Sequence, residues 1–276
     1  MTASMWIKRA LLHLVLLLGV AISIFPFYWL FVMASNTTGD IFKYPPTLTI
    51  GSKLLVNMRN MLDAIDFWGP FLNSLFVATL TAVLVVFFDS LAAFVFAKFD
   101  FPGKKPLFVI LLATFMVPAQ LSVVPQFVIM AHLGWVGSFK ALIIPAMVNA
   151  YGIFLARQYA EGAISADLLE AGRLDGAGFF RLYWNVAVPV LRPIMAFLGI
   201  FTFIGVWNDY LWPLIVLTSP QKLTLQVALA QLNGLYATDY SMVMAGTLLA
   251  AVPLIIVFLF GARQFIRDLA AGAVKG

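Results

Sequence analysis

The 276-residue chain is too apolar for a soluble globular protein. Hydrophobic residues make up 63% of it and charged residues 11%, whereas a soluble domain carries about 25% charged residues. The mean hydropathy is +0.99. These values exclude a water-facing surface over most of the chain and indicate a protein of the bilayer. The net charge of +5 is dispersed in short segments between apolar runs, so no nucleic-acid-binding face is predicted.

Cysteine and histidine chemistry is largely excluded. The chain has no cysteine, so it has no disulfide, thiolate nucleophile or sulfur-ligated metal. Its two histidines, His13 and His132, lie far apart and lack the HExxH spacing of a zinc site. We therefore predict no metal site, and we expect both histidines to act at the membrane interface or in packing.

Six apolar segments are long enough to cross a bilayer. A hydrocarbon core about 30 Å thick needs about 20 apolar residues per helix, and only a helix satisfies its own backbone hydrogen bonds in lipid. We predict an all-α integral membrane protein with six transmembrane helices over Leu11–Ala34, Phe71–Phe96, Leu107–Met130, Ala141–Gln158, Val188–Thr218 and Tyr240–Gln264. Lys8 and Arg9 also suit a cleaved leader, but an apolar run of about 24 residues favours a retained helix.

The distribution of basic residues predicts the orientation. With the N-terminus in the cytoplasm, 12 of the 17 basic residues fall on inner segments and 5 on outer ones. Cytoplasmic segments carry the excess of lysine and arginine in inner-membrane proteins. Both termini are therefore predicted to be cytoplasmic. The outer basic residues are Lys43, Lys53, Arg59, Lys140 and Lys222.

The inner segment of residues 159–187 is predicted to form an amphipathic helix rather than a plain linker. Ser165 suits an N-cap, and Asp167 falls in the first turn, where the helix dipole favours an acid. Glu170 and Arg173 are spaced as an i,i+3 ion pair, and Gly176 with Gly178 permits a bend. A second short helical piece follows, with apolar side chains at Phe179, Leu182, Tyr183 and Val186.

This segment has two interpretations from its residues alone. Ala171 and Gly172 carry little or no side chain, so another surface could approach closely and dock there. The alternative is a solvated connector that lies at the lipid headgroups. The spacing by itself favours docking.

The same segment resembles a known family motif. Glu170-Ala171-Gly172, then Gly176, then Val186-Ala187-Val188-Pro189 is similar to the EAA loop of ABC importer permeases, with Gly172 in place of the usual alanine. The resemblance implies the type I permease fold and a coupling helix that docks into an ATP-binding cassette. The residues it assigns to coupling are Glu170, Ala171, Gly172, Asp175, Gly176 and Pro189.

Two further stretches resemble the carbohydrate-uptake, maltose-type branch of that family. Trp207–Leu214 is similar to the WNxxLWPL stretch, and the end of the chain is similar to a permease tail whose contact residues are Val274, Lys275 and Gly276. The implied organisation is residues 1–68 as an N-terminal stub, first helix and outer loop, residues 69–265 as the core of five helices, and residues 266–276 as a cytoplasmic tail.

The resemblance also implies partners. These are a second, homologous permease subunit, two ATP-binding cassette subunits, an extracytoplasmic sugar-binding protein, the sugar and membrane lipid. The chain has no phosphate-binding loop of the GxxxxGKS or GxxxxGKT type, so ATP and Mg²⁺ must be bound by partner subunits and no cofactor by this chain.

Two aspartates inside the predicted spans are functional candidates by default, because ionisable groups there are costly. We expect Asp89 to pair with a nearby basic side chain. Near Asp209 the chain offers aromatic faces and hydrogen-bonding groups that suit a sugar, with an aromatic belt and helix packing as the alternative. The proposed substrate-pathway residues are Trp207, Asn208, Asp209, Tyr210 and Trp212. Pro118, Pro125 and Pro213 predict kinks.

Other classes of function fit less well. An ion-coupled secondary transporter needs a relay and usually shows inverted repeats, and a membrane enzyme needs a nucleophile or metal cluster. The predicted cargo is a sugar, a disaccharide or oligosaccharide, with glycerol-3-phosphate or a polyol as the alternative. A phosphate cargo favours basic residues along the pathway, and none lies deep in the six predicted spans.

Overall fold

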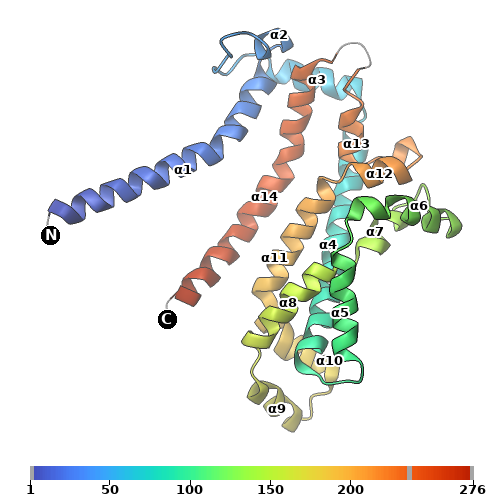
Figure 1. Ribbon diagram of the computed structural model, residues 1–276. Helices are drawn as coiled ribbons and strands as arrows, with labels where there is room; N and C mark the ends of the chain where they lie inside the picture. The colour runs from blue at the N-terminus through green and yellow to red at the C-terminus, as the bar shows by residue number, and fades with distance from the viewer. Residues whose placement is uncertain (1–2, 235–237, 274–276) are drawn as a thin grey trace. The chain divides into compact units, whose positions relative to one another are not determined.

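The computed structural model describes residues 3–234 and 238–273, with side chains described for residue 6 and for residues 8–234 and 238–261. The described part of the chain is all-helical (Figure 1). It divides into two compact units, Met1–Phe67 with Ala228–Val252 and Trp68–Val227 with Pro253–Gly276. Each unit is considered by itself below.

The first unit contains one long apolar helix and two short helices. These are α1 (Ala3–Ser35), α2 (Thr38–Ile41) and α3 (Leu54–Ala64), together with the beginning of α14 (Tyr240–Ala273). Along α1, apolar side chains such as Leu17 and Ile22 are exposed. A helix that is apolar all round and not covered by protein is suited to lipid. The segment after α1, predicted as an outer loop, contains α2 and α3.

A polar junction joins α2 to the start of α14 within this unit. The hydroxyls of Thr38 and Ser241 both donate to Oδ1 of Asp239, at 2.6 and 2.5 Å, and the backbone N–H of Ser241 donates to the same atom at 3.0 Å. Partial burial raises the pKa of Asp239, but these hydrogen bonds outweigh it and hold the pKa below its usual value. Asp239 therefore stabilises the helix N-terminus as an ionised cap.

The second unit is built around α4. Its helices are α4 (Trp68–Lys98), α5 (Lys104–Phe115), η1 (Ala119–Ser122), α6 (Val123–His132), α7 (Lys140–Ala146), α8 (Ala150–Ala163), α9 (Ala166–Leu174), α10 (Phe179–Leu182), η2 (Tyr183–Ala187), α11 (Val188–Trp207), α12 (Leu211–Val216), η3 (Pro220–Lys222), the first half of α13 (Leu225–Ala230) and the part of α14 from Pro253. Ala93 of α4, Ala156 of α8 and Leu198 of α11 pack together in the core. Small side chains at such positions let helices in a membrane approach closely.

The predicted spans agree with the helices in position but not always in continuity. Among the described residues, five helical stretches are long and apolar enough to cross a membrane: Lys8–Ser35, Trp68–Lys98, Lys140–Ala163, Phe179–Trp207 and Tyr240–Gly261. The third predicted span is a bent pair, Lys104–Phe115 with Ala119–His132, that turns by 92°. Pro118 lies at this break. Because proline has no backbone N–H, the helix loses a hydrogen bond there. If this bent pair is taken as one span, the described residues contain up to six membrane spans.

The fifth predicted span, Val188–Thr218, is wrong at both ends. Helical structure already begins at Phe179, because α10 and the π-helical turn η2 continue directly into α11. It ends at Trp207, and a separate helix, α12, begins at Leu211. Asn208, Asp209 and Tyr210 therefore lie at a break rather than inside a helix, and Pro213 lies in the first turns of α12.

Candidate functional site

The coupling loop begins with a capped helix, as predicted. The hydroxyl of Ser165 accepts from the backbone N–H of Leu168 at 3.3 Å, and Asp167 is in the first turn of α9. One side of the helix is anchored, because Leu169 is buried against Ile164 and Leu182. The helix ends at Leu174, and Gly176 follows its C-cap with a φ of +76°, in the left-handed region that glycine adopts without strain.

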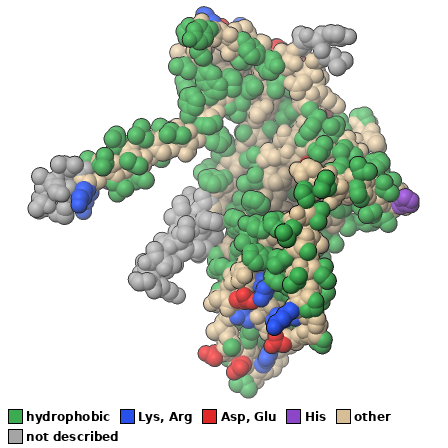
Figure 2. All heavy atoms as spheres, in the orientation of Figure 1, with side chains coloured by type: hydrophobic (Ala, Val, Ile, Leu, Met, Phe, Trp, Pro, Cys, Tyr) green, Lys and Arg blue, Asp and Glu red, His purple; other side chains and the backbone are tan. Residues whose placement is uncertain are grey.

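The opposite side of α9 is free to meet a partner. Glu170 and Ala171 are exposed, and the apolar side chain of Leu174 is 89% exposed. Glu170 and Leu174 are four residues apart, so they lie on the same face of the helix. In Figure 2 the acidic and basic side chains of this unit gather over α9 and the helix ends beside it. An exposed apolar side chain with polar groups at its rim is an arrangement found at protein–protein contact sites.

Two details of the predicted loop are corrected. No ion pair joins Glu170 to Arg173 in the described chain; instead, the guanidinium of Arg173 lies over the ring of Phe99, 5.7 Å from its centroid. Gly172 does not leave room for a partner. A Cβ there would meet Cδ2 of Leu182 at 2.7 Å, so the chain's own α10 occupies that space.

The remaining coupling residues also lie on the surface of the loop. Asp175 forms the C-cap of α9, where its backbone N–H donates to the carbonyl of Ala171 at 3.0 Å. Pro189 is exposed in the first turn of α11, a position where proline costs no helical hydrogen bond. The tail residues Val274, Lys275 and Gly276 lie outside the described residues.

The break between α11 and α12 separates the five proposed pathway residues into different environments. Trp207 is 1% exposed and packs against Phe71 and Phe203, with ring centroids 5.5 and 5.7 Å apart. Asn208 and Tyr210 are exposed, whereas Asp209 and Trp212 are half-buried. The structure therefore brings only Asp209 and Trp212 to a common cavity. Trp207 does not line this cavity and instead packs in the protein interior next to the break.

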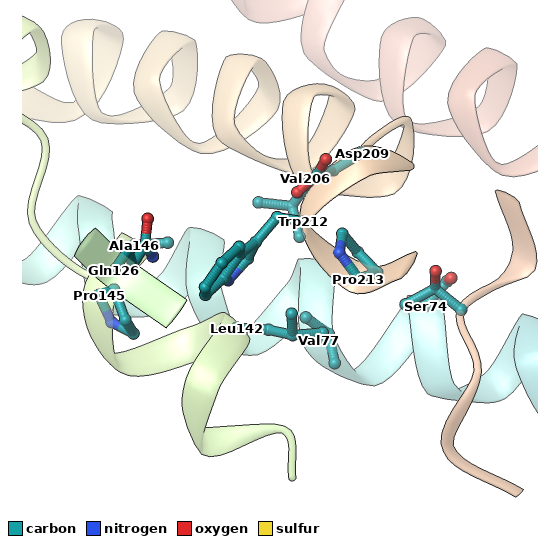
Figure 3. A pocket seen from close by; sticks show the side chains of 11 residues that line it. Ser74, Val77, Gln126, Leu142, Pro145, Ala146, Val206, Asp209, Trp212 and Pro213 are labelled. Carbon is teal, nitrogen blue, oxygen red and sulfur yellow. The ribbon is translucent and has the colours of Figure 1, made fainter. Parts of the chain in front are cut away.

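This cavity has a volume of about 140 Å³ and lies among α4, α6, α7 and α12 (Figure 3). Its polar lining consists of Ser74, Gln126, Asp209 and Thr224, and none of its lining residues is basic. Figure 3 shows the indole of Trp212 extending toward Pro145. The indole N–H donates to the carbonyl of Ala141 at 3.0 Å, which fixes the ring.

Two groups in the cavity have capacity for a ligand. The Thr224 side chain is 4% exposed, and its Oγ1 has no hydrogen-bond partner in the structure. A buried hydroxyl without a protein partner keeps its capacity to donate and to accept a hydrogen bond. The Asp209 carboxylate accepts from the backbone N–H groups of Leu211 and Trp212 and so caps α12, but a carboxylate has further lone pairs to offer. Sequence reasoning missed Ser74, Gln126 and Thr224, because nothing local marks them.

Asp89 does not pair with a basic side chain, contrary to our expectation. It is fully buried in α4, and its Oδ1 accepts from the backbone N–H of Asn149 at 3.0 Å. Its Oδ2 has no partner in the structure and lies against Gly152 of α8. The helix α8 therefore begins directly on the Asp89 carboxyl.

Gly152→Ala is expected to displace α8 from α4 and lower stability by about 1–3 kcal/mol, the usual range for an overpacked core. A Cβ at Gly152 would overlap Oδ2 of Asp89 and would lie 3.4 Å from Leu198. The matched control is Gly162→Ala on the same helix, where nothing lies within 4 Å and alanine favours the helix. The apparent unfolding midpoint in nanodiscs measures both. Equal midpoints would contradict the close α4–α8 contact.

Among the described residues, no group of three or more histidine, cysteine, aspartate or glutamate side chains is placed to hold a metal ion. The features these residues do offer are the exposed face of α9 and the hydrogen-bonding groups of the cavity.

Comparison with known proteins identifies the family. Residues 90–269, more than half of the chain, match the family described as "Binding-protein-dependent transport system inner membrane component". The chain belongs to this family. It is therefore a multi-pass inner membrane protein and a transport component, not an enzyme, and the predicted resemblance to importer permeases is confirmed.

The sequence similarity to known transport proteins extends over almost the whole of this inner membrane component. It is 31% identical to the arabinooligosaccharides transport system permease protein AraQ of Bacillus subtilis, over 98% of this chain and 97% of the relative. It is 33% identical to the lactose transport system permease protein LacG of Rhizobium radiobacter, with 95% and 94% covered. It is 32% identical to the sn-glycerol-3-phosphate transport system permease protein UgpE of Salmonella typhi, with 93% and 94% covered.

A solved structure confirms the fold. The inner membrane component matches a chain of a bacterial ABC transporter involved in the import of the acidic polysaccharide alginate, with a TM-score of 0.81 and 23% identity over 96% of this chain and 99% of that one. At this identity the likeness shows the fold alone. The type I permease fold predicted from the EAA-like loop is thereby confirmed.

Proposed function

We propose that this chain is one of two homologous permease subunits of an ATP-driven importer for a neutral disaccharide or oligosaccharide. Two ATP-binding cassette subunits bind ATP and Mg²⁺, and an extracytoplasmic binding protein delivers the sugar. Both termini face the cytoplasm, and Val274, Lys275 and Gly276 contact the cassettes. The observation that carries this proposal is the exposed face of α9, which presents Glu170 and Leu174 on a helix anchored from behind by Leu169.

The coupling step follows from this anchoring. Docking of Glu170 and Leu174 into a cassette ties α9 to the movement of that cassette. Because Leu169 packs with Leu182 and Tyr183, a displacement of α9 is passed to the segment that leads into α11. Packed cores move as rigid bodies rather than deforming continuously. ATP-driven closure of the cassettes thereby rocks the helices that line the pathway.

The choice of a neutral sugar rests on the cavity at Asp209 and Trp212. Its polar groups are hydroxyls, an amide and a carboxylate, which accept from or donate to sugar hydroxyls, and Trp212 offers an aromatic face. A carboxylate without a basic neighbour in the lining disfavours a phosphate. The AraQ and LacG relatives favour a sugar, and the UgpE relative keeps glycerol-3-phosphate as the second candidate. The volume of about 140 Å³ suits part of a sugar, so the partner permease must complete the pathway.

The test begins with the partners. The chain is expressed from its own operon, purified in mild detergent, and its partners are identified by mass. Recovery of a second permease and a cassette is expected. The complex is then reconstituted in proteoliposomes with its binding protein, and uptake of labelled arabino-oligosaccharide, lactose and glycerol-3-phosphate is measured with and without ATP.

We expect ATP-dependent uptake of a neutral sugar and none of glycerol-3-phosphate. Uptake of glycerol-3-phosphate alone would replace the cargo while leaving the importer class intact. Purification of the chain without a cassette, together with uptake driven by an ion gradient, would overturn the class itself in favour of a secondary transporter.

A further inference from the structure

Two adjacent polar residues of α4, Asp89 and Ser90, lie fully buried inside a predicted membrane span. Neither belongs to the coupling loop or to the cavity described above. Buried polar groups in such a segment are costly unless they hydrogen-bond. Each of the two makes a hydrogen bond to a different element, and both elements lead to the coupling loop.

Asp89 holds α8, the helix that leads into the coupling loop; α8 is called the entering arm below. Its Oδ1 accepts from the backbone N–H of Asn149 at 3.0 Å. The Asn149 side chain in turn caps α8, accepting from the backbone N–H groups of Tyr151 at 2.9 Å and Gly152 at 3.2 Å. Asp89 therefore fixes the N-terminus of α8 on α4. From there α8 runs to Ala163, and two residues separate it from α9.

Ser90 holds η2, the turn that leads from the coupling loop into α11; η2 with α11 is called the leaving arm below. Its hydroxyl donates to the carbonyl of Val86 at 2.5 Å, so its Oγ is available as an acceptor for the hydroxyl of Tyr183, 2.8 Å away. Tyr183 is fully buried and begins the π-helical turn η2. Such turns inside helices are frequent at functional sites. The segment that follows is α11, which ends at the cavity.

We propose that Asp89 and Ser90 form a two-armed clasp that fastens both arms of the coupling loop to one turn of α4, and that they act as positioning residues for coupling. The inference rests on the proposed function of α9. A hydrogen bond adds a directional constraint to the apolar packing of these helices and so fixes their register. With both arms held on α4, a displacement of α9 moves α4, α8 and α11 together.

The test uses the complete importer in proteoliposomes and reads the number of sugar molecules taken up per ATP hydrolysed. Tyr183→Phe keeps the buried ring and removes only the hydroxyl. We expect it to lower uptake per ATP by about threefold to tenfold, as expected for the loss of one hydrogen bond. Ser90→Ala should give an equal or smaller loss, because the Tyr183 hydroxyl can then donate to the carbonyl of Phe87, 3.4 Å away. The double variant should lose no more than Tyr183→Phe, because that change already removes the hydroxyl that both bonds need. If Ser90→Ala does not assemble, Tyr183→Phe alone carries the test.

Two controls separate the clasp from general destabilisation. Tyr151→Phe removes a hydroxyl that makes no hydrogen bond in the described chain, so uptake per ATP should stay at the wild-type value. Asp89→Asn keeps the acceptor for the Asn149 N–H and should also couple normally, whereas Asp89→Leu should not. A ratio that falls equally in Tyr151→Phe and Tyr183→Phe would assign the effect to packing and overturn the clasp.

The proposed function fails separately from the clasp. If Glu170→Lys leaves uptake per ATP unchanged in the same assay, the docking of α9 is wrong and the clasp falls with it. If Glu170→Lys uncouples while Tyr183→Phe, Ser90→Ala and Asp89→Leu all keep the wild-type ratio, docking stands and the clasp alone is wrong.

Discussion

Glu170→Lys is expected to lower ATP-driven uptake at least tenfold while the protein still inserts and assembles. Glu170 is exposed and makes no ion pair in the described part of the chain, so its replacement leaves the fold of the loop unchanged. Reversal of its charge places a lysine where the cassette must accept a carboxylate. Truncation of one partner of a desolvated charge pair typically costs about 2–5 kcal/mol in binding, and reversal costs at least as much.

The matched control for this variant is Asp100→Lys. Asp100 is a fully exposed acid of the same unit, and it pairs with Lys104 four residues along the chain at 3.2 Å. Exposed ion pairs contribute about 0–1 kcal/mol, so uptake should stay near the wild-type value. Stimulated ATP hydrolysis and uptake are measured in parallel. Normal uptake in Glu170→Lys, or an equal loss in Asp100→Lys, would show that α9 does not dock through Glu170.

The membrane spans were predictable because they depend on composition over a window. Segments of about 20 apolar residues have no alternative to a helix in lipid. In the loop of residues 159–187 the signals were local, because a cap and a bend depend only on neighbouring residues. The predicted N-cap at Ser165, the first-turn acid and the bend at Gly176 all agree with the structure.

The breaks in the helices were only partly predictable. The kink predicted at Pro118 is confirmed, although its angle of 92° was not predictable, because a proline marks a bend without fixing its size. The residues 208–210 lie within strongly apolar surroundings, so a window average passes over them and the end of α11 at Trp207 was missed. At the second break, the Asp209 carboxylate accepts the first N–H groups of α12 and so stabilises a new helix start.

Hydrogen bonds between residues distant in sequence were also not predicted. Asp89 is 60 residues from Asn149, and Ser90 is 93 residues from Tyr183. No spacing rule connects such pairs, and charge logic alone pointed to a basic partner for Asp89. A backbone N–H at a helix N-terminus serves the carboxyl instead, because it supplies a donor and the positive end of the helix dipole.

Trp207→Ala is expected to lower stability by about 3–5 kcal/mol, the usual cost of removing a large buried aromatic side chain. The indole is 1% exposed, lies edge-on to Phe71 and stacks on Phe203 with an interplanar angle of 16°. Its loss leaves a cavity directly behind the break at Asp209. For a chain of this size the apparent unfolding midpoint should fall by about 10 °C. Trp6→Ala, at a side chain that is 62% exposed, should shift it little.

Trp207→Phe separates packing from cargo contact. Phenylalanine keeps a ring against Phe71 and Phe203, so most of the stability and the KM for sugar uptake should be retained. If Trp207 instead contacts the sugar, this variant should raise KM while the unfolding midpoint stays unchanged. Trp212→Ala provides the comparison within the cavity, because it removes the aromatic face beside Asp209. A larger rise in KM for Trp212→Ala than for Trp207→Phe would place the sugar in the cavity lined by Asp209 and Trp212, and would assign Trp207 a packing role.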